Sequence, residues 1–136
     1  MNIYRRNIYR RNISSGAKWK ELIGYSRAVV YGNSVELSGT TAVVNGALAH
    51  PGDAYLPATT IIEIVGKALQ EAGSDFSTFV RTRTHDKSIS EWERLKKAHA
   101  EALHDVMSAT ALMEVSGIVG PEMLVEIEYT AYLSVE

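Results

Sequence analysis

The sequence contains no cysteine. Disulfide bonds, thiol nucleophiles and cysteine-based zinc sites are therefore excluded. No apolar run approaches the ~18 residues of a membrane-spanning helix, and the first residues do not form a hydrophobic signal segment. The 136 residues are 46% hydrophobic, which suits one ordinary core. We predict a single cytoplasmic domain with no membrane segment.

Familiar catalytic and cofactor motifs are also missing. There is no phosphate-binding glycine loop, no G-x-G-x-x-G and no nucleophile elbow. The histidines of "HAEALH", His99 and His104, are five residues apart. That spacing is about 140° around a helix, so the two side chains do not converge on a metal. We predict neither a metal nor a cofactor.

Acidic residues are absent from residues 1–11, which hold four arginines in the tandem repeat "NIYRRNIYRR". The rest of the chain contains the other ten Lys and Arg residues and all sixteen Asp and Glu residues, so the body of the protein is acidic. A basic arm with tyrosines could contact RNA, or it could be a lead-in to the first strand. The acidic body argues against a nucleic-acid partner. We predict an arm over residues 1–9 and one domain over residues 10–136.

Turn residues divide the first half of the chain. Two strand-like runs flank Gly32-Asn33, a pair that favours a tight hairpin turn. Residues 45–52, "NGALAHPG", predict a loop. Asp53 can cap a helix that continues to Ala72 and ends at Gly73.

Two helices alternate with strands in the rest of the chain. The first helix buries a stripe at 3.6-residue spacing: Ala54, Ala58, Ile61, Ile62, Val65, Ala68, Leu69 and Ala72. The second begins near Ser88 or Ser90, and its predicted inner stripe is Trp92, Leu95, His99, Ala102, Leu103 and Val106. Strands are predicted over "FVRTRTHD", "TALMEVSG" and "MLVEIEYTAYL". This order indicates an α+β fold: one mostly antiparallel sheet with both helices on a single face.

The last strand, "LVEIEYTAYL", has two contrasting faces. Val125, Ile127 and Tyr129 predict a core face, whereas Glu126 and Glu128 lie on the other. These glutamates could form cross-strand ion pairs on an exposed face. Alternatively, they belong to a partly buried polar layer at a subunit interface. We expect the same face to carry Leu124, Tyr132, Leu112 and Phe79, and Arg81 or Arg83 to pair with Glu128.

Three blocks resemble one known family. "GYSRAVVYGNSVELSGTTAV", "IIEIVGKALQEAGSDFSTFVRTRTHD" and "EVSGIVGPEMLVEIEYTAY" are similar to the Rid (YjgF) family of reactive-intermediate deaminases, also labelled L-PSP endoribonucleases. The resemblance covers roughly residues 10–133. It implies a chorismate-mutase-like fold, a homotrimer with the open sheet faces packed inside, and a small-molecule ligand in each cleft between subunits.

The resemblance also implies a site. Tyr25 matches the cleft tyrosine, and Ser38-Gly39 match a Ser-Gly pair whose backbone binds the substrate. Leu112 takes another backbone-binding position, and Glu126 matches the glutamate that positions the attacking water. Thr110 stands where active members carry the arginine that clamps the substrate carboxylate. The chain therefore resembles an arginine-lacking branch of the family.

Other residues are candidates at the same site. His99 occupies a position that is aromatic in many active members, and Arg81 or Arg83 could replace the missing arginine. Three functions stay open: hydrolysis of imine or enamine metabolites without the usual clamp, metabolite binding without turnover, and ribonuclease activity.

Overall fold

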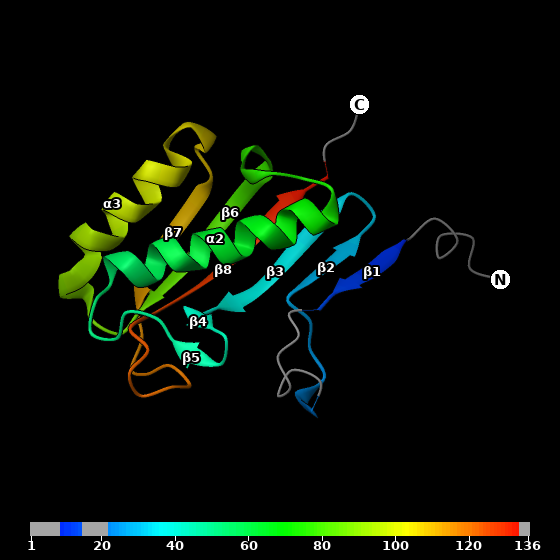
Figure 1. The fold of residues 1–136 in the computed structure, drawn as a ribbon. Helices are drawn as coiled ribbons and strands as arrows, with labels where there is room; N and C mark the ends of the chain where they lie inside the picture. The colour runs from blue at the N-terminus through cyan, green and yellow to red at the C-terminus, as the bar shows by residue number, and fades with distance from the viewer. Residues whose placement is uncertain (1–8, 15–21, 134–136) are drawn as a thin grey trace.

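The computed structural model describes residues 9–14 and 22–133. A six-stranded sheet has the order β1-β2-β3-β8-β6-β7 (Figure 1). Its strands are β1 (Arg10–Ile13), β2 (Ala28–Tyr31), β3 (Ser34–Thr40), β6 (Phe79–Asp86), β7 (Ala109–Glu114) and β8 (Val125–Tyr132). All neighbouring pairs are antiparallel except β6–β7, because helix α3 (Trp92–Leu103) crosses over between these two strands. The predicted mostly antiparallel sheet is confirmed.

Helix α2 (Tyr55–Ala72) follows the predicted pattern closely. The eight residues of the expected stripe are all buried, and Gly73 ends the helix with a φ of 89°. Ala54 is the N-cap residue, yet Asp53 still contributes, since its Oδ2 accepts a hydrogen bond from Leu56 N at 2.9 Å. The start of the helix is therefore stabilised by the predicted carboxylate, one position earlier than a standard cap.

Helix α3 is preceded by a short 3-10 helix, η3 (Ile89–Glu91). The buried residues of α3 are Leu95, Ala98 and Leu103, so the inner stripe predicted for this helix is wrong in part. Trp92 is 43% exposed and carries Lys96 Nζ over its ring at 5.0 Å. Ala98 replaces Ala102 in the buried line, since α3 packs against α2 as well as over the sheet.

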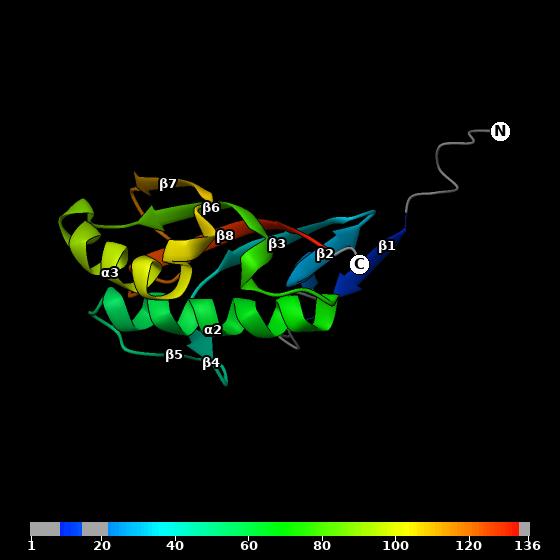
Figure 2. The ribbon, with the colours of Figure 1, turned by 90° about the horizontal axis from the view of Figure 1, so that it is seen from above.

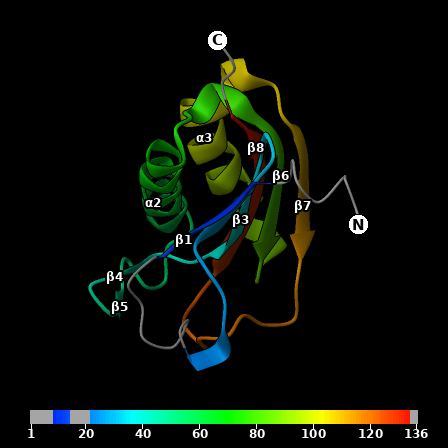
Figure 3. The ribbon, with the colours of Figure 1, turned by 90° about the vertical axis from the view of Figure 1, so that its right-hand side faces the viewer.

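Both helices lie on the same side of the sheet (Figures 2 and 3). The core between the layers includes Val30, Leu37, Ile61, Leu69 and Tyr129. No described helix covers the opposite face, called the open face below. No helix in the described part of the chain is long and apolar enough to cross a membrane.

Two loops differ from the sequence-based expectations. The stretch predicted as a loop over residues 45–52 contains half of a small hairpin, β4 (Val43–Val44) and β5 (Ala47–Leu48). In the β2–β3 turn only Gly32 has a positive φ, 55°, although Gly32-Asn33 forms the two-residue turn as predicted.

Phe79 and Leu112 are not on the open face, which corrects the prediction for both. A bulge between Phe79 and Arg81 shifts the register of β6 against β8, so Phe79 turns into the core and stacks on Tyr129 with ring centroids 4.8 Å apart. Leu112 lies opposite Thr84 in the β6–β7 register and packs against the core beneath the helices.

Candidate functional site

Glu126 lies on the open face of β8, directly over Gly39. A bulge in β3 between Leu37 and Thr40 leaves Gly39 outside the regular ladder. A Cβ atom built on Gly39 would lie 2.6 Å from Glu126 Oε1. Only glycine leaves room for the carboxylate in this position. The observed position of the Glu126 side chain therefore requires a glycine at residue 39.

Ser38 fastens the same bulge to the chain that leads into β2. Its backbone N–H donates to Arg27 O at 2.9 Å, and its Oγ donates to Ser26 O at 2.6 Å. Asn12 of β1 donates to Ser26 Oγ at 2.9 Å. The backbone beside Glu126 is therefore held by hydrogen bonds that link β3 and β1 through the segment before β2.

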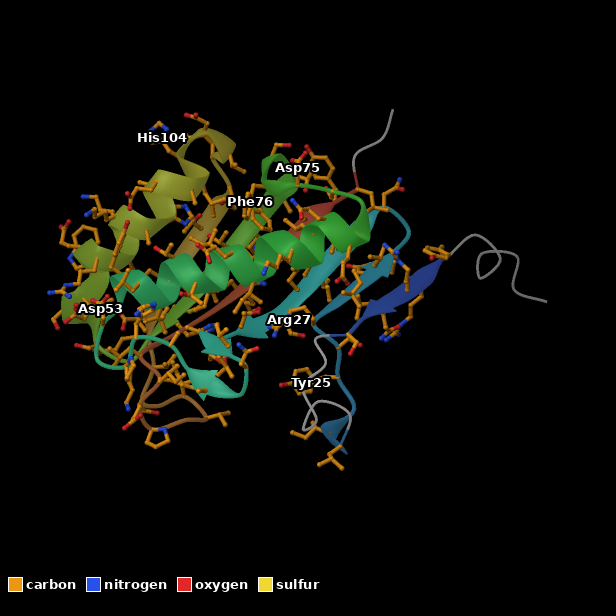
Figure 4. The ribbon with its side chains drawn as sticks, viewed as in Figure 1. Tyr25, Arg27, Asp53, Asp75, Phe76 and His104 are labelled. Atoms are coloured by element: carbon orange, nitrogen blue, oxygen red, sulfur yellow. The ribbon has the colours of Figure 1, made fainter. Side chains whose placement is uncertain are left out.

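Tyr25 comes from the loop before β2 and is half-buried (Figure 4). Burial raises the pKa of its phenol; the Arg27 charge lowers this pKa and the Glu126 charge raises it. Both charged groups therefore act on the phenol. The structure brings together four of the predicted residues: Tyr25, Ser38, Gly39 and Glu126.

Arg27 was not predicted as a functional residue. It is half-buried, and its Nη1 donates to Thr40 Oγ1 at 2.9 Å. Burial lowers the pKa of Arg27, and Tyr25 raises it. The in-and-out alternation of a strand does not predict where the Arg27 side chain points, because Arg27 precedes β2. The orientation of this side chain depends on the bulge in β3.

Glu128 is paired within its own chain. Across the β6–β8 register it lies opposite Arg83, whose Nη1 is 3.3 Å from Glu128 Oε1, and His85 Nε2 is 3.8 Å from Glu128 Oε2. Both the Arg83 and Glu128 side chains are about two-fifths exposed, so the Arg83 pair contributes about 0.2–1 kcal/mol. The predicted cross-strand ion pair is confirmed with Arg83; Arg81 lies opposite Thr130.

His85 is a second neighbour that sequence reasoning missed. It lies opposite Glu126 in the register, and its Nδ1 is 3.3 Å from Glu126 O. Alternation along β6 puts His85 on the same face as Arg81 and Arg83, but only the register with β8 shows that it adjoins Glu126.

Thr110 and Leu112 are separated from Glu126 within one chain. Thr110 lies opposite Thr82, whose Oγ1 donates to Thr110 Oγ1 at 2.9 Å. Thr110 Oγ1 in turn donates to Ser108 O at 3.1 Å. Thr82 is buried on the helix side, and β6 lies between β7 and β8. Thr110 therefore lies on the opposite face of the sheet, two strands away from Glu126.

His99 lies in the helical layer on α3 and is half-buried, and burial lowers its pKa. A groove of about 590 Å³ runs between α2 and α3. None of the predicted site residues is among its described lining residues. Among the residues that the structure describes, no group of three or more His, Asp or Glu side chains could hold a metal ion.

The fold and the site define an α+β sheet protein with a carboxylate over a glycine bulge. The family model described as Endoribonuclease L-PSP matches residues 17–133. The chain belongs to this family, which is also the YjgF or Rid family.

Relatives and solved structures agree with this assignment. An uncharacterized protein of Streptomyces coelicolor, SCO2049, is 31% identical over 120 residues, which is 88% of this chain and 90% of the relative. The crystal structure of Rv2704 from Mycobacterium tuberculosis, described as a member of the YjgF/YER057c/UK114 family, superposes with a TM-score of 0.83 and 33% identity. That match covers 92% of this chain and 100% of Rv2704. PA3499 of Pseudomonas aeruginosa, a protein of unknown function, is 26% identical with a TM-score of 0.78, covering 95% and 96% of the two chains.

Proposed function

We propose that the chain hydrolyses the C=N bond of a small imine, or of the imine tautomer of an enamine. The observation that carries the proposal is the Glu126 carboxylate over the bulge at Gly39, beside the Tyr25 phenol. The carboxylate takes a proton from a water molecule as the water oxygen bonds to the imine carbon. Glu126 passes that proton to the nitrogen to give a carbinolamine. The nitrogen then takes the proton of the new hydroxyl group as the C–N bond breaks, and the products are a carbonyl compound and ammonia.

The proposed site is completed by a second subunit. Thr110 and Glu126 lie on opposite faces of one sheet, so both can border one cleft only if a neighbouring copy supplies Thr110 and Leu112. A homotrimer with closed symmetry would provide three such clefts. The open face supports this arrangement, because it combines ion-paired charges with exposed apolar side chains such as Val80 at 45% and Tyr132 at 46%.

Hydrolysis is tested with purified protein, using 2-aminoacrylate generated in situ and a panel of imines without a carboxylate. We expect ammonia release above the uncatalysed rate, reduced at least 100-fold in Glu126→Gln, which removes the proton acceptor. Glu122→Gln, an exposed loop variant, should keep the wild-type rate. Background rates for all substrates, or an active Glu126→Gln, would contradict the proposal.

Thr110 favours a second candidate, a protein that binds a metabolite without turning it over. A threonine forms neutral hydrogen bonds only, and the Thr110 hydroxyl already pairs with Thr82 and Ser108. The site then lacks the charge-assisted bonds that orient a carboxylate for attack. A ligand that raises the melting temperature and is recovered unchanged would decide for binding.

The same preparation tests ribonuclease activity, which should disappear on deletion of residues 1–9 if the basic arm carries it.

A further inference from the structure

A pocket separate from the Glu126 site lies between α2, the β4–β5 hairpin and the end of β1. Its volume is about 420 Å³, within the usual range of about 300–1,000 Å³ for small-ligand pockets. Arg27 lines it on the sheet side, and the hydrogen bond to buried Thr40 directs the guanidinium to the helix side of the sheet. Figure 4 shows Arg27 between α2 and Tyr25.

The charge of Arg27 lacks a counter-ion in the described part of the chain. None of its described neighbours places a carboxylate within the 4.0 Å ion-pair distance of the guanidinium. Thr40 uses one of the five N–H donors of the group. A half-buried guanidinium with spare donors is suited to a planar carboxylate, which it can bind through two parallel hydrogen bonds.

The rest of the pocket limits which carboxylate fits. Helix α2 contributes two acids, Glu63 and Glu71, along with Lys67. The two acids balance the charges of Lys67 and Arg27, so the pocket suits a ligand that carries both a carboxylate and an ammonium group better than a simple anion. The remaining lining is mixed: Ser14, Asn45 and Thr60 are polar, whereas Val43 and Val44 of the hairpin form an apolar side together with Ile13, Ile64 and Ala68.

We propose that this pocket binds an α-amino acid with an apolar side chain. The carboxylate lies on Arg27, the ammonium group faces Glu63 and Glu71, and the side chain contacts the wall of Val43, Val44 and Ile64. The pocket and Glu126 are on opposite sides of the sheet, so this inference does not depend on the proposed hydrolysis.

Three matched ligands test the inference by calorimetry and by the amide NMR spectrum of the full chain. L-Leucine carries both charges, L-leucinamide lacks the carboxylate, and N-acetyl-L-leucine lacks the ammonium group. We expect saturable binding of L-leucine, at least tenfold weaker binding of the other two, and shifts at Val44, Thr60 and Ile64. Arg27→Gln should weaken L-leucine binding at least tenfold, and Arg27→Lys should restore part of it. Arg94→Gln, an exposed arginine on α3, is the control and should bind as the wild type does.

Several outcomes would overturn the inference: no L-leucine binding by the wild type, equal binding of all three ligands, or shifts at Gly39 and Glu126 instead of the pocket. If Arg27→Gln does not fold, Glu63→Gln/Glu71→Gln decides in its place. This variant should bring L-leucine down to the affinity of N-acetyl-L-leucine, and unchanged affinity would refute the proposal.

Discussion

Glu126 Oε1 lies 2.6 Å from the point that a Cβ atom would occupy on Gly39. The distance is shorter than any ordinary contact between these atoms, so a side chain at Gly39 and the present position of the carboxylate exclude each other. The β3 bulge produces this approach, and the hydrogen bonds of Ser38 hold the bulge in place.

Gly39→Ala should displace the Glu126 carboxylate. We expect the new methyl group to push the flexible end of the Glu126 side chain aside at little cost in unfolding free energy, and to abolish most of the hydrolysis or ligand binding at Glu126. Urea denaturation and the ammonia assay measure the two effects. Gly117→Ala is the matched control, because a Cβ there has no atom within 4 Å. If both variants behave like the wild type, Gly39 does not constrain the carboxylate.

Asp86→Asn should stabilise the protein above neutral pH. Asp86 is 0% exposed, its Oδ1 accepts from Ser88 N at 2.9 Å, and its Oδ2 has no hydrogen-bond partner in the described structure. Burial raises the pKa of this carboxyl, the Ser88 N–H lowers it, and the charges of Glu91 and Glu114 raise it again. The net shift is upward, so the folded protein holds the proton more tightly than the unfolded chain.

The sign of the pH dependence follows from that shift. The Asp86 contribution to stability is largest at low pH and decreases as the pH rises from about 4 through the raised folded-state pKa. Asparagine keeps the acceptor for Ser88 N and does not ionise, so the variant should gain about 1–3 kcal/mol over the wild type at pH 8 and less at pH 4.5. Urea denaturation at both values checks this, with exposed Asp105→Asn expected to change little. A variant that is less stable than the wild type at pH 8 would show that the ionised carboxylate is favourable here.

The hydrophobic periodicity of the sequence was sufficient to predict which residues are buried within a single helix or strand. The eight-residue stripe of α2 and the alternation of β8 both place their residues correctly, since helix and strand periods are local properties. The same applies to Gly73, which only has to adopt a positive φ at the helix end.

Bulges and strand registers were beyond these patterns. A single extra residue near Val80 turns Phe79 into the core, and no composition signal marks it. The face of Thr110 depends on its register with Thr82 of another strand, and Arg27 depends on the bulge at Gly39. The sequence therefore predicts the site of one chain only in part, because the positions of its residues depend on bulges in two strands, β3 and β6.

Substitutions at Glu128 test the proposed trimer. Glu128→Leu should keep the trimer, because an apolar side chain can pack in a subunit interface, although Arg83 loses its partner. Glu128→Lys should dissociate it, since the new cation would lie beside Arg83 and His85. Sedimentation equilibrium measures the mass of each. Glu93→Lys makes the same charge change on the exposed surface of α3 and should leave the trimer intact. A monomeric wild type at micromolar concentration would contradict the interface and the shared cleft.

Thr110→Arg tests whether a neighbouring subunit completes the Glu126 site. An arginine here would offer the charge-assisted bonds that threonine lacks, each about 1.5–3 kcal/mol. Affinity for a small carboxylate such as pyruvate should then rise at least tenfold. Thr110→Met adds bulk without charge and also removes the hydrogen bond with Thr82, so it should bind pyruvate no better than the wild type. Calorimetry measures pyruvate binding to both variants and to each variant combined with Glu126→Gln. If Thr110 and Glu126 share a cleft, the gain in pyruvate affinity from Thr110→Arg should change when Glu126 is replaced. If they do not, the gain should be independent of Glu126. If Thr110→Arg binds pyruvate no more tightly than Thr110→Met, Thr110 lies outside the ligand site, and the two-subunit cleft must be built from other residues.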